Sequence, residues 1–377
     1  MHIRAMGYVT LILMTLLGTA AYGSAATAAA PRMEVCFVLD TTGSMGGLIE
    51  GAKLKIWSIA NQMISAKPTP RLKIALIGYR DRGDEYITRR YDLSDDIDTV
   101  YANLKKFQAG GGGDLPESVN QALNEAVSMI HWSTDRNVLK LIFLVGDSPP
   151  HMDYPDDVKY PTTCELAVTK DLIIDTVQCG SYEGTTSIWQ EIANRAEGKF
   201  VAISQAGDMQ VVSTPMDGEL ATLNMAIGRT LAPYGAAIAR TAVMAKQAVS
   251  EVAAAPIVAD RLAYNINTDK AVQGRGDLVD DLKAKQVVLA QIKKEELPPE
   301  MQNMTMEQKE AYLKSKAEER QKLQIRIAEL VKQRQAYIQE EMRRQTGKGG
   351  FDEQVQTMIT EQAKAKGIQY TRGDRKK

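Results

Sequence analysis

Short apolar runs and amphipathic stretches alternate over the first two hundred residues of the chain. The apolar runs are rich in Val, Ile, Leu and Phe and lie at 34–39, 72–79, 138–145, 172–177 and 200–203. Runs of this length are typical of strands that are buried on both faces of a parallel sheet. Residues with helical periodicity lie between them, at 48–64, 100–107, 118–130, 164–169 and 188–196. The alternation predicts an α/β fold with a doubly wound, mostly parallel sheet, to which 86–91 adds an antiparallel edge strand.

The pattern changes after Pro233, where helical periodicity continues without further strands. We expect helices at 235–255, 278–294, 306–344 and 351–365. The third has an apolar stripe of Leu, Ile and Val along one side. Arg320 and Arg334 interrupt this stripe, so packing into a helical hairpin or against the first domain is favoured over a coiled coil. The chain therefore divides into a sheet domain at 34–232 and a helical, partly coiled-coil-like C-terminal region at 233–377.

Residues 1–30 have the pattern of a targeting segment. His2 and Arg4 precede an uncharged apolar run at 8–17, and small residues follow up to Ala30. A short basic start, an apolar core of about ten residues and a small-residue exit are typical of a secretory signal peptide. We therefore expect an exported protein, either periplasmic or secreted. An uncleaved membrane anchor is the alternative, which the short apolar run disfavours because a span needs roughly 20 strongly apolar residues.

Composition and charge exclude several classes of protein. The chain has 377 residues, of which 44% are hydrophobic and 25% charged, and such a composition excludes a disordered or collagen-like chain. The net charge of −1 is the sum of −9 over 34–232, +6 over 233–377 and +2 from Arg4 and Arg32. Acidic residues are interspersed throughout the basic part, which disfavours nucleic-acid binding. Three cysteines are too few for a disulfide-built scaffold, and the sequence leaves open whether Cys164 and Cys179 form a bridge.

Three loops at the ends of predicted elements carry the candidate chemistry. In a doubly wound sheet, ligands bind at the carboxyl ends of the strands, where such loops meet. The polar side chains of these loops are carboxylates and hydroxyls, namely Asp40, Thr42, Ser44, Asp114, Glu117 and Asp147. Oxygen ligands of this kind are typical of hard divalent cations such as Mg²⁺, Mn²⁺ or Ca²⁺. The alternative is that Asp40 and the hydroxyls only cap the following helix.

The segment Asp40-Thr41-Thr42-Gly43-Ser44 resembles the Asp-x-Ser-x-Ser motif of the von Willebrand factor A domain, with Thr as the middle hydroxyl. Asp147 resembles the Asp that this family has after its central strand. The family usually has a Thr before a helix, which is missing here. Instead, Asp114-Leu115-Pro116-Glu117 resembles the Asp-x-Pro-Glu variant of integrin β inserted domains. That variant implies that Glu117 approaches the main ion and that Asp114 serves a neighbouring cation, with Asp114 as the alternative main ligand.

The resemblance covers residues 34 to about 232 and implies a metal-ion-dependent adhesion site (MIDAS). It implies that a Mg²⁺-type ion, held by Asp40, Thr42, Ser44, Glu117 and Asp147, binds a carboxylate of a protein partner. We therefore expect an exported, non-enzymatic adhesion or assembly module. A helical scaffold with a structural metal site and a metal-dependent hydrolase are the alternatives. Self-association through the C-terminal helices is a second partner hypothesis, and membrane association is expected only if the signal segment stays uncleaved.

No catalytic residue is predicted. Ser44 lies in Gly-Ser-Met-Gly and not in the Gly-x-Ser-x-Gly turn of a hydrolase nucleophile. His151 follows Asp147 by four positions, and we expect it to be an exposed loop residue. The run of four glycines at 110–113 is not followed by Lys-Ser or Lys-Thr, so a nucleotide-binding loop is not expected either.

Overall fold

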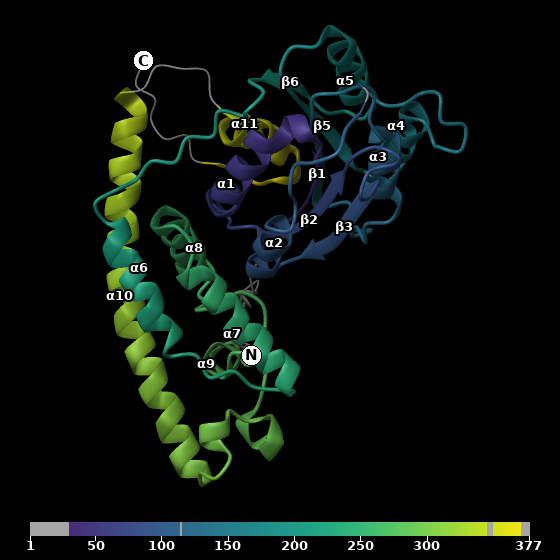
Figure 1. Ribbon diagram of the computed structural model, residues 1–377. Coiled ribbons are helices and arrows are strands. Elements are labelled where there is room, and N and C mark those ends of the chain that lie inside the picture. The colour runs from purple at the N-terminus through teal and green to yellow at the C-terminus, as the bar shows by residue number, and fades with distance from the viewer. Residues whose placement is uncertain (1–29, 114, 345–349, 371–377) are drawn as a thin grey trace, which may run out of the picture.

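The computed structural model describes residues 30–113, 115–344 and 350–370. Its centre is a six-stranded sheet in the order β3-β2-β1-β4-β5-β6, which is parallel except for the edge strand β3 (Figure 1). The strands are β1 (Arg32–Asp40), β2 (Arg71–Tyr79), β3 (Thr88–Ser94), β4 (Leu139–Gly146), β5 (Ile173–Cys179) and β6 (Phe200–Ile203). Every predicted strand is present, so the predicted doubly wound α/β fold is confirmed. The predicted signal peptide lies outside the described residues.

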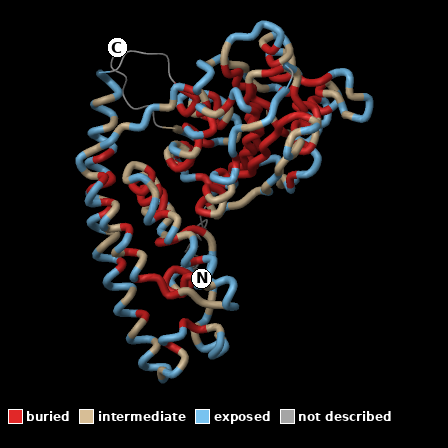
Figure 2. The backbone as a smooth tube through the Cα atoms, viewed as in Figure 1, coloured by how far each residue is buried: buried red, intermediate tan, exposed pale blue. Residues whose placement is uncertain are grey.

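Helices cover both faces of the sheet, because successive side chains of a strand point to opposite faces. Phe37 and Leu39 of β1 join one buried apolar cluster, and Cys36 and Val38 join the other. The first cluster is covered by α1 (Gly46–Ile64), α2 (Ile97–Leu104) and α11 (Phe351–Ala363). The second is covered by α3 (Val119–Ser128), α4 (Tyr160–Thr169) and α5 (Glu183–Arg195). Buried residues accordingly concentrate in the sheet layer (Figure 2).

The C-terminal region is helical, as predicted. It contains α7 (Ala237–Glu251), α8 (Ala255–Asn267), α9 (Leu278–Lys283) and the long α10 (Met306–Arg344). The helix α6 (Asp217–Gly228) precedes the predicted boundary at 233 but packs on α8 and α10. α10 runs along the other helices and packs against α6, α8 and α9, while α8 also packs against α1 of the sheet domain (Figure 1). Among the described residues, no helix is both long enough and apolar enough to cross a membrane.

The sequence pattern misses α6 and most of α8. α8 is buried on several sides, between α1, α6 and α10, so its apolar residues do not form one clear stripe. The predicted helix at 278–294 is also too long, since α9 ends at Lys283. Lys285 takes a left-handed conformation with φ 56°, and short 3₁₀ turns follow.

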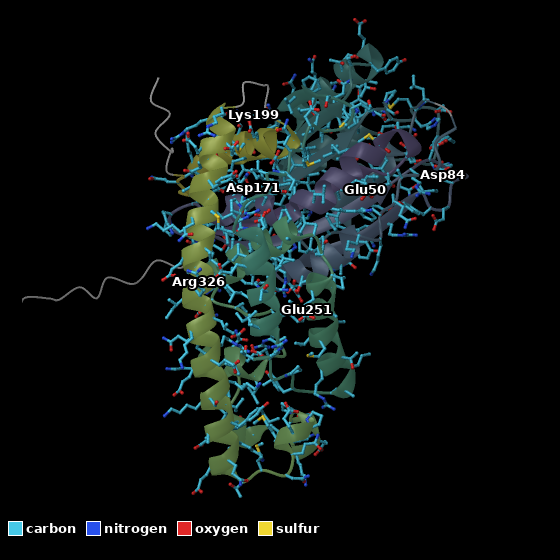
Figure 3. The ribbon with its side chains drawn as sticks, turned by 60° about the vertical axis from the view of Figure 1, so that its left-hand side comes forward. Glu50, Asp84, Asp171, Lys199, Glu251 and Arg326 are labelled. Carbon is cyan, nitrogen blue, oxygen red and sulfur yellow. The ribbon has the colours of Figure 1, made fainter. Side chains whose placement is uncertain are left out.

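Buried ion pairs explain why arginines interrupt the apolar stripe of α10. Arg320 pairs with Asp277 and Asp280 at the start of α9, and all three side chains are at most 5% exposed. Arg334 reaches Asp217 of α6 at 2.7 Å. Arg326, by contrast, lies on the outer side of α10 and pairs with the exposed Glu219 (Figure 3). The two interrupting arginines therefore bind α10 to its neighbours within the same chain.

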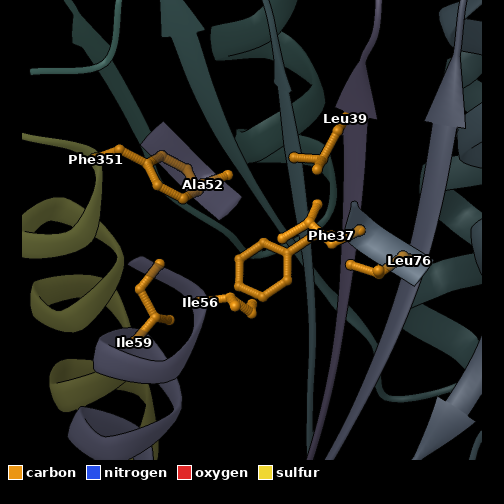
Figure 4. A pocket seen from close by; sticks show the side chains of 8 residues that line it. Phe37, Leu39, Ala52, Ile56, Ile59, Leu76 and Phe351 are labelled. Atoms are coloured by element: carbon orange, nitrogen blue, oxygen red, sulfur yellow. The ribbon is translucent and has the colours of Figure 1, made fainter. Parts of the chain in front are cut away.

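The last helix returns from the helical region to the sheet domain. The ring of Phe351 in α11 lies 6.2 Å from that of Phe37 in β1. Together with Ile56 and Leu76 they line a small apolar pocket between α1, the sheet and α11 (Figure 4). Residues from the end of the chain thus complete the core that its first strand begins.

The three cysteines, Cys36, Cys164 and Cys179, are all buried and free. The bridge between Cys164 and Cys179 that the sequence left open is therefore not formed in this structure.

Candidate functional site

The loop after β1 gathers a carboxylate and two hydroxyls. Asp40 is fully buried at the end of the strand, and its Oδ1 accepts hydrogen bonds from the Thr42 N–H at 2.8 Å and the Thr42 hydroxyl at 2.6 Å. The Thr42 and Ser44 hydroxyl oxygens lie 3.3 Å apart. Thr42 is buried whereas Ser44 is exposed, so the group opens to solvent at Ser44. Helix capping does not explain this arrangement, because Thr42 makes no side-chain cap hydrogen bond to the following turn.

Glu117 comes to the same place from the loop before α3. Its backbone N–H donates to Pro149 at 2.9 Å and its carbonyl accepts from the His151 N–H at 3.0 Å. The Glu117 loop is thereby tied to the loop after β4. Its buried carboxylate lies beside Gly112 and Thr42, since a Cβ on Gly112 would lie 3.4 Å from both Glu117 Oε1 and Thr42 Cβ. Asp114 lies outside the described residues, so the choice between Glu117 and Asp114 as ligand stays a prediction.

Asp147 follows β4 and is half-buried. Its Oδ1 accepts a hydrogen bond from the Ser148 hydroxyl at 3.0 Å, and its Oδ2 accepts one from the Gln205 amide at 2.7 Å. The Thr185 hydroxyl donates to the Asp147 carbonyl at 2.8 Å. The loop is therefore held from α5 and from the chain after β6.

Negative charge accumulates at this edge of the sheet, and the buried carboxylates of Asp40 and Glu117 form no ion pair with a Lys or Arg among the described residues. Burial, and then the charge of Asp147, raises the pKa of Asp40 to about 7, although hydrogen bonds from Thr42 act in the opposite direction. Burial, and then the charge of Asp40, raises the pKa of Glu117 to about 9. The nearby Arg80 directs its guanidinium to the carbonyls of Thr41 and Gln108 and to Glu85. Both carboxylates would ionise readily if a positive ion lay between them.

The donor set fits a hard cation that is bound partly through hydroxyls and water. Asp40 Oδ2 and Glu117 Oε2 are buried and have no hydrogen-bond partner among the described residues. Buried carboxylate oxygens are rarely left unpaired, so an ion or ordered water is the expected partner. Within the described ranges, no three His, Cys, Asp or Glu side chains lie close enough to hold an ion by themselves. Direct contacts would therefore have to include Thr42, Ser44 and water, which suits Mg²⁺ because it keeps several waters.

The structure also places residues at this edge that the sequence patterns do not indicate. Gln205 contacts Asp147 from the loop after β6. The phenol of Tyr79, at the end of β2, is fully buried beside Gly146, and its hydroxyl lacks a partner among the described residues. Tyr79 ends a strand and Gln205 follows one, so both lie at the carboxyl edge of the sheet. Their position at the end of a predicted strand is the sequence feature from which they could have been predicted.

The expectation that His151 is an exposed loop residue is wrong. Its side chain is only 7% exposed, and its ring stacks on Tyr154 with centroids 4.1 Å apart. Its Nδ1 lies 2.8 Å from Asp153 and its Nε2 lies 3.3 Å from Asp81. His151 is buried because its backbone is tied to Glu117, which draws the loop onto the domain.

The sheet domain is similar in sequence to known proteins. Residues 34–214 match the model of the von Willebrand factor A domain family. Von Willebrand factor A domain-containing protein 7 of Rattus norvegicus is 32% identical over 120 residues, which are 32% of this chain and 12% of that protein. A putative ariadne-like RING finger protein of Acanthamoeba polyphaga mimivirus is 26% identical over 164 residues, 43% of this chain and 16% of that protein. The chain thus spans less than a fifth of the length of these relatives.

Solved structures with similarity to this chain include proximal thread matrix protein 1 from the mussel byssus. One of its structures has a zinc-occupied MIDAS motif and matches with 17% identity and a TM-score of 0.37, covering 47% of this chain and 42% of that chain. A second structure of the same protein matches with 16% identity and a TM-score of 0.36, covering 48% and 44%.

Proposed function

Because residues 34–214 match the model of the von Willebrand factor A domain family, we propose that the protein is a metal-ion-dependent protein-binding module. In this proposal a Mg²⁺-type ion lies at the carboxyl edge of the sheet and binds a carboxylate of a protein partner. The helical region carries the domain, and export through residues 1–30 brings it to the periplasm or the cell exterior. Adhesion and assembly are the functions that such a module serves.

One observation carries the proposal. Two buried carboxylates, Asp40 and Glu117, each have a buried oxygen that no described residue binds, and they lie beside the hydroxyls of Thr42 and Ser44. A buried charge without a partner is unfavourable, whereas a divalent cation at the same place would satisfy both groups. Ser44 is exposed, so an ion held beside it would be accessible to a ligand from solvent.

A protein carboxylate is the ligand that suits such a site. Hydroxyls and water leave an ion electrophilic, and an incoming carboxylate supplies both charge and an oxygen ligand. In this proposal the site binds the carboxylate of its partner and does not transform it. We therefore assign no catalytic residue.

Calorimetry on the metal-free protein tests the ion site. We expect one equivalent of Mg²⁺ or Mn²⁺ to bind the wild type, and Asp40→Ala to abolish binding because it removes the carboxylate at the centre of the site. Glu251→Ala is the matched control, since it removes an exposed carboxylate on the helical region (Figure 3). Failure of Mg²⁺, Mn²⁺ and Ca²⁺ to bind the wild type would overturn the proposal.

A scaffold with a purely structural ion is the second candidate, which the extensive packing of α10 on other helices favours. Capture of proteins from an envelope fraction, with Mg²⁺ or with EDTA, separates the two. A binding module captures a partner only with the ion and melts at nearly the same temperature without it. A scaffold melts at a lower temperature in EDTA than with Mg²⁺ and captures the same proteins in both conditions. Light scattering of the same samples tests self-association through the C-terminal helices.

A further inference from the structure

Gln205 joins two of the loops that form the candidate site. It follows β6 by two residues, and its amide nitrogen donates to Asp147 Oδ2 at 2.7 Å. The same nitrogen lies 3.4 Å from the backbone carbonyl oxygen of Ser44. One side chain therefore contacts the loop after β1 and the loop after β4 at once.

We propose that Gln205 is a positioning residue of the metal site, which holds Asp147 in the orientation that the ion requires. This inference rests on the proposed function, because it assigns Gln205 a role at that same site. Gln205 does not itself bind the ion. It acts through Asp147, whose Oδ2 it binds.

The surrounding backbone provides room for the Gln205 amide. Gly180, after β5, has φ 79°, and a Cβ there would lie only 2.5 Å from Gln205 Oε1. The N–H of Gly180 donates to Ile203 at 2.9 Å, which fixes the start of the Gln205 loop. At its other end, the Gly207 N–H donates to Ser204 at 3.0 Å and the Gly207 carbonyl accepts from Phe351 at 2.9 Å. Both ends of the loop are fixed, so the amide approaches Asp147 from a defined direction.

The chemistry of the contact explains why it should matter for the ion. An amide N–H is a neutral donor, so it restricts the rotation of the Asp147 carboxylate without neutralising its charge. Ser148 binds the other oxygen, and together the two donors set the plane of the carboxylate. Outer contacts of this kind typically change metal affinity by about 10–100-fold when they are removed.

The experiment compares Gln205→Met with Gln210→Met, using Mg²⁺ alone as the probe in calorimetry. Methionine keeps the length of the side chain but removes the amide donor, and Gln210 is an exposed glutamine of the same loop. We expect Gln205→Met to weaken Mg²⁺ affinity by about 10–100-fold while leaving the melting temperature in EDTA unchanged. Gln210→Met should leave both unchanged. Equal Mg²⁺ affinity in wild type and Gln205→Met would overturn the inference.

A variant at Gly180 separates positioning from general damage. Gly180→Ala places a Cβ where the Gln205 amide lies, so it should weaken Mg²⁺ binding in the wild type but have little further effect when Gln205 is already methionine. Independent effects of the two substitutions would contradict a shared role.

Hydrogen exchange distinguishes failure of this inference from failure of the proposed function. In metal-free protein, the amides of Asp147, Ser148 and His151 should exchange faster in Gln205→Met than in Gln210→Met, whether or not an ion can bind. If the wild type binds no ion, the proposed function fails, and with it the role of Gln205 toward the ion. If the wild type binds Mg²⁺ while exchange and affinity are the same in both variants, only the role of Gln205 fails.

Discussion

At the scale of single residues, the carboxyl edge of the sheet holds buried polar groups with no hydrogen-bond partner among the residues that the structure describes. The hydroxyl of Tyr79 and the Oδ2 of Asp40 both lie against Gly146, where a Cβ would be 2.5 Å from the first and 3.1 Å from the second. Glycine is therefore required at this position by close approach. Within the described part of the chain, these two groups and the Glu117 Oε2 have no hydrogen-bond partner, which indicates a region that a bound ion or water would complete.

The raised pKa values of Asp40 and Glu117 predict a pH dependence of the metal-free protein. Their folded values, about 7 and about 9, lie above the value of about 4 in an unfolded chain. The folded state therefore holds protons that the unfolded state releases, and the stability that these groups contribute is lost as pH rises through 7 and 9. We expect the melting temperature in EDTA to fall between pH 5 and pH 9 and Mg²⁺ to reverse much of the fall.

The double variant Asp40→Asn, Glu117→Gln is the control for this prediction. Its melting temperature should change less with pH than that of the wild type, and Mg²⁺ should not change it. A wild-type melting temperature with the same pH dependence as the double variant would contradict the prediction.

Asp175 of β5 gives a second pH-dependent prediction, away from the candidate ion site. Burial raises its pKa to about 6, although its Oδ1 accepts hydrogen bonds from the Lys199 N–H and from Gln362 of α11. Stability from this group is lost as pH rises from roughly 4 to 6. Asp175→Asn keeps an oxygen acceptor for these hydrogen bonds but carries no charge. Between pH 4.5 and pH 7, its free energy of unfolding should therefore rise by up to about 2 kcal/mol relative to that of the wild type. Urea unfolding of both proteins at pH 4.5 and pH 7 measures this difference. The same difference at the two pH values would contradict the prediction. The exposed Glu183→Gln serves as control.

At the scale of elements, the length and charge of α10 are apparent in the sequence but its contacts are not. Its bounds agree with the predicted 306–344. The two arginines on its apolar stripe look unfavourable for packing, yet both find buried carboxylates on α6 and α9. The coiled-coil interpretation stays a prediction, whereas the contacts within one chain are part of the structure.

Two arginines on α10 should therefore differ sharply in their effect on stability. Arg320→Met leaves Asp277 and Asp280 buried without their partner, which should cost about 3–5 kcal/mol. Arg326→Met removes only exposed pairs, with Glu219 and Glu329, and should leave the melting temperature unchanged. Denaturant unfolding of both variants measures the difference. Similar effects would mean that the buried pair does not anchor the helix.

At the scale of the whole molecule, the sheet domain and the helical region are joined by polar and apolar contacts. Arg261 of α8 pairs with Asp98 of α2 through two hydrogen bonds of 2.6 and 3.0 Å, and both side chains are at most 4% exposed. α11 then closes the core of the sheet domain from the end of the chain. The core of the domain therefore includes residues far beyond those that match the family model, and we expect its folding to depend on them.

Truncation of Phe351 tests this dependence. Phe351→Ala should cost about 3–5 kcal/mol, because the ring is 2% exposed and packs on the first strand and α1. Ile238→Ala is the matched control, since Ile238 is 82% exposed and its loss should change stability by less than about 0.5 kcal/mol. Calorimetric melting of both variants measures the difference. A small effect at Phe351 would mean that α11 is not needed for the domain.

The sequence by itself determined the strands, the long helix and the three loops of the site, because each depends on a local pattern of apolar, glycine and acidic residues. Only the tertiary structure decided that Glu117 lies beside Thr42, that Gln205 binds Asp147, and that His151 is buried. It also decided that α11 packs on β1 and that Arg320 meets Asp277. These contacts join segments far apart along the chain. Their energies depend on which groups burial brings together, and no local pattern contains that information.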